Sequence, residues 1–127
     1  MKLFTSIIEK GLIKNGIESF KAIRKDGNTK DYTPLVKIFT PDAQATWLFT
    51  ELEIEDLIGD VHQLSGRLFG LCDLGMSFPE LGYVDMIELT SLKGKLGLPV
   101  ERDRHWQANK TLLEYADEAR NAGRIIC

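Results

Sequence analysis

The sequence predicts a single small α+β domain, in which an antiparallel β-meander of about four or five strands carries N-terminal and C-terminal helices packed on it. The chain has 127 residues, of which 43% are hydrophobic and 28% are charged, as in an ordinary soluble globular domain. Short runs of branched and aromatic residues occupy its middle, and helical periodicity is confined to its two ends. We therefore treat residues 1–127 as one domain, with a helical part over 1–31 and an α+β core over 32–126.

The N-terminal part has the apolar spacing of amphipathic helices. Residues 3–15 place an apolar stripe on one helical face, and Gly16 stands where helices often stop. A second helix is predicted over 17–25, followed by a polar linker over 28–33. The side chains expected to be buried by these two helices are Leu3, Ile7, Ile8, Leu12, Ile13, Ile17, Phe20 and Ile23 or Ala22.

Two β-hairpins are predicted in the middle of the chain, where runs of aromatic and branched residues are separated by Pro, Gly and Asp. The acidic and polar residues 53–66 between the hairpins are expected to form a loop, with at most one helical turn. The predicted strands are residues 34–39 and 44–52 in the first hairpin, and residues 67–74 and 81–86 in the second.

Two pairs of residues with capping-box spacing predict where the last two helices start. Asp85 and Glu88 predict a short helix that begins near residue 86 and stops by Gly94 or Gly97. Thr111 and Glu114 predict a helix over 112–121, and a glycine follows just past its end.

Charge is distributed unevenly along the chain. The net charge of −3 argues against a protein that coats nucleic acid through its overall field. Residues 40–92 contain ten acidic residues and one base, Arg67, whereas the two flanks together contain fifteen bases and nine acids. The folded molecule would then have an acidic side and a more basic side, unless the segments mix in space.

The cysteines and the N-terminus predict a cytoplasmic protein. Cys72 lies in an apolar run and Cys127 is the last residue, which is no disulfide framework and fits a reducing compartment. Glu9 and Lys10 interrupt the short apolar patch at the N-terminus, which makes it a poor signal peptide. No apolar stretch approaches the ~20 residues that cross a bilayer, so no membrane association is expected.

The segment 74–83 is the most distinctive candidate for a binding site, because loops are usually polar and this one is apolar. Met76 and Phe78 are predicted to anchor a protein partner, with Glu80 beside them. The structural alternative is that the loop folds back and closes one end of the core. Trp106 is a second candidate for contact with a partner.

Residues 98–106, which are expected to be extended, carry the main alternative. A period of two places Arg102, Arg104 and Trp106 on one face, where they could bind phosphates and stack on a base. Packing of the arginine stems along the Trp106 ring is the structural alternative. A nucleic-acid-binding accessory factor would use Lys93, Lys95, Arg102, Arg104 and Lys110, together with Trp106.

A small hydrolase or metal-dependent enzyme is the second alternative. The opposite face of the same segment carries Glu101, Asp103 and His105, which could ligate a metal or serve as acid and base. Cys72 and His105 could also form a thiolate pair, with Asp73 or Asp103 orienting the imidazole. Solvated charges and a core thiol are the structural alternative, and His62 is expected in a solvated loop. The chain contains no GxGxxG, P-loop or GxSxG motif, and we predict no catalytic residue, no metal and no cofactor.

Three long strings and a closing motif resemble a known family. They are PLVKIFTPDAQATWLFTELE, LFGLCDLGMSFPELGYVDMIEL, LGLPVERDRHW and the closing AR-x-AGRI, and together they span about residues 32–126. The family is a bacterial domain of unknown function found largely on plasmids, conjugative elements and phages. The resemblance implies an accessory protein of a mobile element and supplies no activity, ligand or catalytic residue. We therefore expect a non-catalytic protein that binds another protein, for example in a host defence or restriction system.

Overall fold

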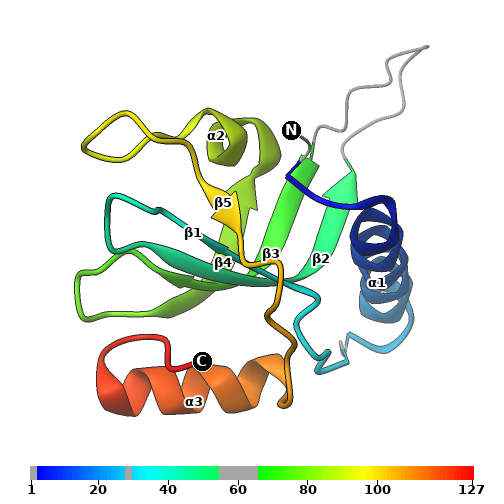
Figure 1. Ribbon diagram of the computed structural model, residues 1–127. Coiled ribbons are helices and arrows are strands. Elements are labelled where there is room, and N and C mark those ends of the chain that lie inside the picture. Colours follow the sequence, from blue (N-terminus) through cyan, green and yellow to red (C-terminus); the bar gives the residue numbers. More distant parts are fainter. Residues whose placement is uncertain (1–2, 28–29, 55–65) are drawn as a thin grey trace.

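The protein folds as an α+β domain, as the sequence predicts. The computed structural model describes residues 3–27, 30–54 and 66–127 (Figure 1). They form three helices and one five-stranded antiparallel sheet with the strand order β4-β3-β2-β1-β5. The strands are β1 (Val36–Phe39), β2 (Thr46–Ile54), β3 (Gly66–Asp73), β4 (Glu80–Asp85) and β5 (Glu101–Arg102), and the helices are α1 (Ser6–Asp26), α2 (Met86–Ser91) and α3 (Leu112–Ala122).

Both predicted hairpins are present. β1 pairs with β2, with Val36 opposite Phe49 and Phe39 opposite Thr46, and β3 pairs with β4. β2 also pairs with β3, so the first four strands form the predicted meander. The strand ends differ from the predicted ones by one or two residues. Most of the loop predicted over 53–66 lies outside the described residues, and so does His62.

The expectation of an extended segment over 98–106 is wrong beyond Arg102. β5 is two residues long, and Arg102 pairs opposite Ile38 of β1. The chain then turns, because the Trp106 N–H donates to the Asp103 carbonyl (3.4 Å) and the His105 N–H donates to Asp103 Oδ1 (3.2 Å). An aspartate that accepts hydrogen bonds from the backbone just after it is typical of turns. The two charged faces expected from strand periodicity therefore do not exist.

The two helices predicted before residue 26 are one continuous helix, α1. Thr5 is its N-cap, and Gly27 is its C-cap with φ of 77°. Gly16 lies in its middle, where a Cβ would come 2.3 Å from the Leu52 carbonyl oxygen of β2. Gly16 therefore allows the helix backbone to approach the sheet and does not end the helix.

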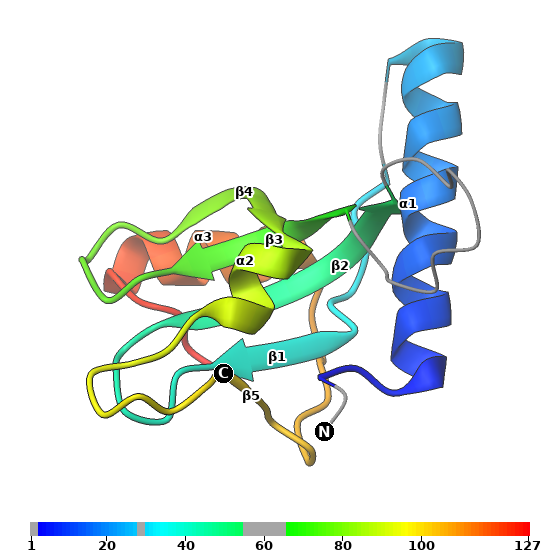
Figure 2. The same cartoon turned by 90° about the horizontal axis from the view of Figure 1, so that it is seen from above.

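α1 buries fewer side chains than its apolar pattern predicts. Leu12 is buried, whereas Ile7 is 84% exposed and Ile17, Phe20 and Ile23 are about half exposed. Figure 2 shows α1 lying across one end of the sheet, roughly perpendicular to the strands, so that only part of it contacts them. This position leaves an apolar stripe on the C-terminal half of α1 facing solvent.

The sheet has a hydrophobic cluster on each face. Alternation along β2 places Trp47 and Phe49 in one cluster and Leu48 in the other. α2 covers the first face and α3 covers the second, on opposite sides of the sheet (Figure 1). The buried members of the first cluster are Phe4, Leu12, Val36, Ile38, Trp47, Phe49, Leu52, Leu68, Met86, Leu89 and Val100. Those of the second are Leu48, Leu71, Leu112, Tyr115, Ala116 and Ala119.

The predicted helix starts are confirmed. Asp85 caps α2 by accepting the N–H groups of Ile87 and Glu88 at 2.9 and 3.1 Å. Thr111 and Glu114 form a reciprocal capping box at the start of α3. Within the described parts of the chain, no helix combines the length and apolar character that crossing a membrane requires.

Candidate functional site

Two candidate sites lie at opposite ends of the sheet. Away from α1, the loop after α2, the β1–β2 turn and the β3–β4 loop lie along one side of the molecule, and the β3–β4 loop is next to the C-terminal end of α3 (Figure 1). Asp42 in the β1–β2 turn ties two of these loops together, because its Oδ2 accepts the N–H groups of Leu96 (2.6 Å) and Leu98 (3.3 Å). The β1–β2 turn and the loop after α2 are therefore held in fixed positions relative to each other.

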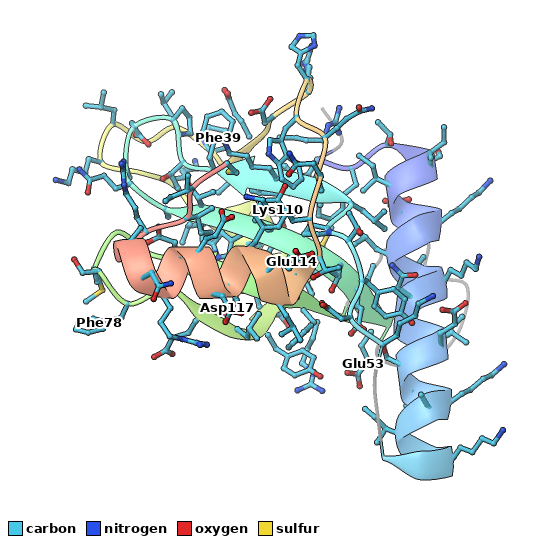
Figure 3. The ribbon with its side chains drawn as sticks, turned by 90° about the horizontal axis from the view of Figure 1, so that it is seen from below. Phe39, Glu53, Phe78, Lys110, Glu114 and Asp117 are labelled. Atoms are coloured by element: carbon cyan, nitrogen blue, oxygen red, sulfur yellow. The ribbon has the colours of Figure 1, made fainter. Side chains whose placement is uncertain are left out.

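The β3–β4 loop at this end exposes large apolar side chains. We call residues 74–79 the apolar loop. Met76 is 70% exposed and Phe78 is 79% exposed, and Leu74 is also exposed. Figure 3 shows Phe78 projecting from the end of the molecule farthest from α1. These side chains do not fold back onto the core, and an exposed apolar group of this kind is typical of an interaction site.

The buried carboxylate of Asp73 holds the apolar loop in place. Its Oδ1 accepts the Gly75 N–H and its Oδ2 accepts the Ile125 N–H, both at 2.9 Å. Ser77 adopts a left-handed conformation with φ of 67°, and it packs against Gly123 at the end of α3. The loop is thus fixed to the C-terminal segment, and its apolar side chains point into solvent from an ordered backbone.

The second candidate site is a groove of about 500 Å³ on the second face of the sheet, between α1 and the start of α3. We call it the carboxylate groove. Figure 3 shows Glu53 at this place, between α1 and the first turn of α3. Its lining comprises Gly16, Ser19, Phe20 and Ile23 of α1, Lys30, Asp31 and Tyr32 of the following segment, Thr50, Glu51, Glu53, Arg67, Phe69, Leu81 and Tyr83 of the sheet, and Leu112 and Leu113 of α3.

A β-bulge places Glu51 in the carboxylate groove. The register between β2 and β3 shifts between Phe49 and Glu51, so that the consecutive residues Thr50 and Glu51 both line the groove. α1 docks on this irregularity, because Asn15 Nδ2 donates to the Thr50 carbonyl (3.0 Å) and the Ser19 hydroxyl donates to Glu51 Oε1. The bulge and the helix together set the position of the Glu51 carboxylate.

Glu51 is only 9% exposed, and burial perturbs its carboxyl group. Desolvation raises the pKa of Glu51, the Ser19 hydrogen bond lowers it, and the negative charge of Glu53 raises it. The net pKa lies above its ordinary value of 4.5. A buried carboxylate with a perturbed pKa in a groove is a recognised mark of a functional site.

The remaining walls of the groove combine aromatic rings with an ion pair. Arg67 donates to Glu53 Oε2 (2.9 Å), and its guanidinium lies 4.3 Å from the Tyr83 ring centroid. Phe69 stacks on Tyr83 with ring centroids 5.0 Å apart. The Tyr32 hydroxyl donates to Glu18 at 2.9 Å. The groove therefore offers carboxylates next to aromatic faces, the arrangement that binds organic cations.

The Glu51→Gln variant is expected to be more stable than the wild type at neutral pH, because it removes a desolvated charge. Since the folded-state pKa is raised, the unfavourable ionisation is complete above that pKa and vanishes below the unfolded-state value. The difference in thermal midpoint should therefore shrink as the pH falls from 8 toward about 4. Glu101→Gln, at an exposed position of β5, is the control and should change the midpoint at neither pH. A Glu51→Gln variant less stable than wild type at pH 8 would contradict this reading.

Comparison with known families identifies the chain only at the level of a family. A family model described as "Protein of unknown function (DUF2958)" matches residues 3–126. The chain belongs to the DUF2958 family. The match begins at residue 3, so the family includes α1 as well as the core that the sequence resemblance spans. No curated protein and no solved structure matches this chain significantly.

The other residues predicted to contact a protein partner lie in different surroundings in this DUF2958 domain. Glu80 is exposed at the start of β4, next to the apolar loop. Trp106 packs against the cluster under α3, with its ring centroid 6.0 Å from that of Tyr115. Trp106 is therefore partly buried against the second cluster and lies apart from the apolar loop.

The residues predicted to bind nucleic acid lie on separate parts of the DUF2958 domain. Lys93 and Lys95 are in the loop after α2. Arg102 donates to the Leu3 carbonyl beside the first cluster, and Lys110 pairs with Glu118 of α3 on the second face. Arg104 lies in the turn after β5 and is exposed. Arg102 and Lys110 are therefore each engaged by a group of this chain.

The residues considered for catalysis are also apart. Cys72 is on β3, whereas Asp103 and His105 follow β5, and β2 and β1 lie between these strands. At about 4.8 Å per strand this separation is roughly 14 Å, too far for a thiolate–imidazole pair. Burial raises the pKa of the Cys72 thiol to about 11, with Glu80 adding to the effect, so the thiol is protonated at neutral pH. In the described portions of the chain, no three His, Cys, Asp or Glu residues are placed to hold a metal.

Sequence reasoning missed the carboxylate groove. Its walls come from α1, β2, β3, β4 and α3, which are distant in sequence, and no local motif marks them. The apolar spacing of α1 marks one wall of the groove. Phe20 and Ile23 lie on the predicted apolar face of this helix, and in the structure each is about half exposed at the edge of the groove. In the sequence, Glu51 and Glu53 are two of the ten acidic residues of segment 40–92, and nothing local distinguishes them from the others.

Proposed function

We propose that this DUF2958 protein is a non-catalytic accessory protein of a mobile genetic element, and that it acts by binding another protein through the apolar loop. The sequence resemblance to proteins of plasmids, conjugative elements and phages supports the biological setting. A component of a host defence or restriction system is the class of partner that suits this setting. This part of the proposal rests on family analogy.

The exposure of Met76 and Phe78 on an ordered loop carries the proposal. Burying one large apolar side chain against a partner contributes about 1.5–3 kcal/mol. Because Asp73 and the end of α3 already hold the loop, little backbone ordering is needed on binding. Methionine and phenylalanine are also enriched at the centres of protein interfaces. A protein partner therefore accounts for side chains that are otherwise unfavourably solvated.

The test is a pull-down from lysate of a natural host with tagged wild-type protein and a Met76→Ser/Phe78→Ser double variant, each with and without nuclease. The double variant should lose the partner while its stability stays within about 0.5 kcal/mol of wild type, because both side chains are exposed. Ile7→Ser, at the 84% exposed position on α1, is the matched control and should retain the partner. With the purified partner, the double variant should bind at least about 30-fold more weakly by calorimetry.

Three outcomes would overturn the proposal. If the double variant retains the same proteins as the wild type, the apolar loop is not the binding surface. If the retained proteins disappear on nuclease treatment, the protein acts through nucleic acid. A large loss of stability in the double variant would show instead that the loop is part of the core.

A further inference from the structure

The carboxylate groove is chemically different from the apolar loop and lies at the other end of the sheet. We propose that the groove binds the basic side chain, arginine or lysine, of a polypeptide partner, with its charged head at Glu51 and the neighbouring apolar residues of the partner on the rim. This inference adds a second binding surface and does not depend on the apolar loop.

The Glu51 carboxylate can accept further hydrogen bonds from a cation. Among the described residues, only Ser19 hydrogen-bonds it, and through one oxygen. A carboxylate can accept about four hydrogen bonds, so Glu51 keeps acceptor positions that are open toward the groove it lines. A guanidinium or ammonium group entering the groove would supply both the donors and the opposite charge.

The other charged side chains of the groove do not occupy the acceptor positions of Glu51. Arg67 is engaged by Glu53, and Asp31 accepts the Leu113 N–H (3.1 Å) at the start of α3. Lys30 lies over the Tyr32 ring, 5.8 Å from its centroid. Among the described residues, no cation pairs with Glu51, and the one charge that acts on its pKa, Glu53, is negative.

Arg67 shows how the groove accommodates a guanidinium. Its head group is held between the Glu53 carboxylate and the face of Tyr83. Glu51 repeats half of this arrangement: β-sheet pairing places it opposite Phe69, whose ring packs on Tyr83. A second, external guanidinium at Glu51 would therefore lie near aromatic surface in the same way as Arg67.

The rim of the groove indicates a polypeptide rather than a small free amine. Phe20, Ile23, Tyr83 and Leu113 are each about half exposed around the opening. A volume of about 500 Å³ exceeds what one guanidinium fills. Arginine and lysine bury their aliphatic stems along apolar walls while the charged head reaches a polar group, and apolar neighbours in the partner would cover the rim.

The experiment is an NMR titration of the intact 15N-labelled protein with four probes. They are acetyl-Leu-Arg-Leu-amide, the same peptide with neutral citrulline in place of arginine, the same peptide with lysine, and agmatine as a free guanidinium amine. The arginine and lysine peptides should shift the amide signals of Glu51, Phe69 and Leu113 in the millimolar range or tighter. The citrulline peptide should bind at least about tenfold more weakly, because it lacks the charge.

Variants separate the charged head from the rim. Glu51→Gln should weaken the arginine peptide about tenfold, and Glu101→Gln, exposed on β5, should leave it unchanged. Leu113→Ser should weaken the peptides and leave agmatine unaffected, because Leu113 is on the rim. Retained amide dispersion in each variant shows that the fold is intact.

Four results would overturn the inference. They are equal binding of the arginine and citrulline peptides, unchanged binding to Glu51→Gln, no shift with any peptide, and agmatine binding as tightly as the peptides. The last result would assign the groove to a small amine. None of these results bears on the apolar loop, so the two surfaces can fail separately.

Discussion

Gly16→Ala is expected to lower the free energy of unfolding by roughly 1–3 kcal/mol, although alanine in place of glycine within a helix normally stabilises by about 1 kcal/mol. The reason is the contact between α1 and β2, where a Cβ at residue 16 would lie 2.3 Å from the Leu52 carbonyl oxygen. A backbone oxygen in a paired strand cannot move aside, so the helix must shift. Urea denaturation measures the change directly.

Gly11→Ala is the matched control in the same helix. A Cβ there would meet the end of the Leu35 side chain at 2.9 Å, and Leu35 is partly exposed and can rotate. Gly11→Ala should therefore raise the free energy of unfolding by about 0.5–1 kcal/mol. Two variants that change stability in the same direction would mean that α1 does not approach β2 as closely as described.

Asp73→Ala is expected to cost about 2–4 kcal/mol of stability and to release the apolar loop. The buried carboxylate accepts the Gly75 and Ile125 N–H groups, and alanine leaves both donors without a partner. Asp73→Asn should cost less, since its single carbonyl oxygen can keep one of the two bonds. The free energy of unfolding from urea denaturation gives the cost, and hydrogen exchange at Gly75 and Ile125 reports the release of the loop.

Asp117→Ala provides the comparison for Asp73. Asp117 lies on α3 with a side chain that is 73% exposed, and its ion pair with Arg120 is also at the surface. Its removal should change stability by at most about 0.5 kcal/mol. If Asp73→Ala were equally mild, or if exchange at Ile125 did not change, then Asp73 would not be what holds the loop. In that case the ordered apolar loop would need another explanation.

We expect a substitution at Glu51 to change stability and ligand binding in opposite directions, and a substitution at Asp73 to lower both. Glu51→Gln should stabilise the fold and weaken a cationic ligand, which is the behaviour of a residue placed for binding at a cost in stability. Asp73→Ala should weaken both the fold and the binding of a protein partner, because it acts through the loop backbone. Measuring both quantities for both variants therefore distinguishes a ligand-contacting side chain from a supporting one.

Local signals made most of the fold predictable. The strands were recognisable because branched and aromatic runs are bounded by turn residues, and α2 and α3 because their caps are encoded within four residues, as at Thr111 and Glu114. The exposed apolar loop could be proposed for the same reason, since Met76 and Phe78 lie in an apolar segment between two strands.

Two of the three failures come from contact between segments distant in sequence, and the third comes from a local turn that strand periodicity does not predict. From its local sequence Gly16 is predicted to end a helix, yet in the structure it allows α1 to approach Leu52. Residues 98–106 read as a strand, but the Asp103 side chain turns the chain after β5. Phe20 and Ile23 are predicted to be buried in the core, but α1 crosses the end of the sheet and leaves both side chains about half exposed.

By itself the sequence determined the fold class, the meander, the helix caps and the apolar character of the β3–β4 loop, because each depends on residues within a few positions of one another. Only the tertiary structure decided that the side chains of Met76 and Phe78 stay in solvent. The hydrogen bond from the Ile125 N–H to the Asp73 carboxylate holds their loop in this position. The tertiary structure also decided that Glu51 is buried in a groove, because a β-bulge and a helix from the other end of the chain meet there.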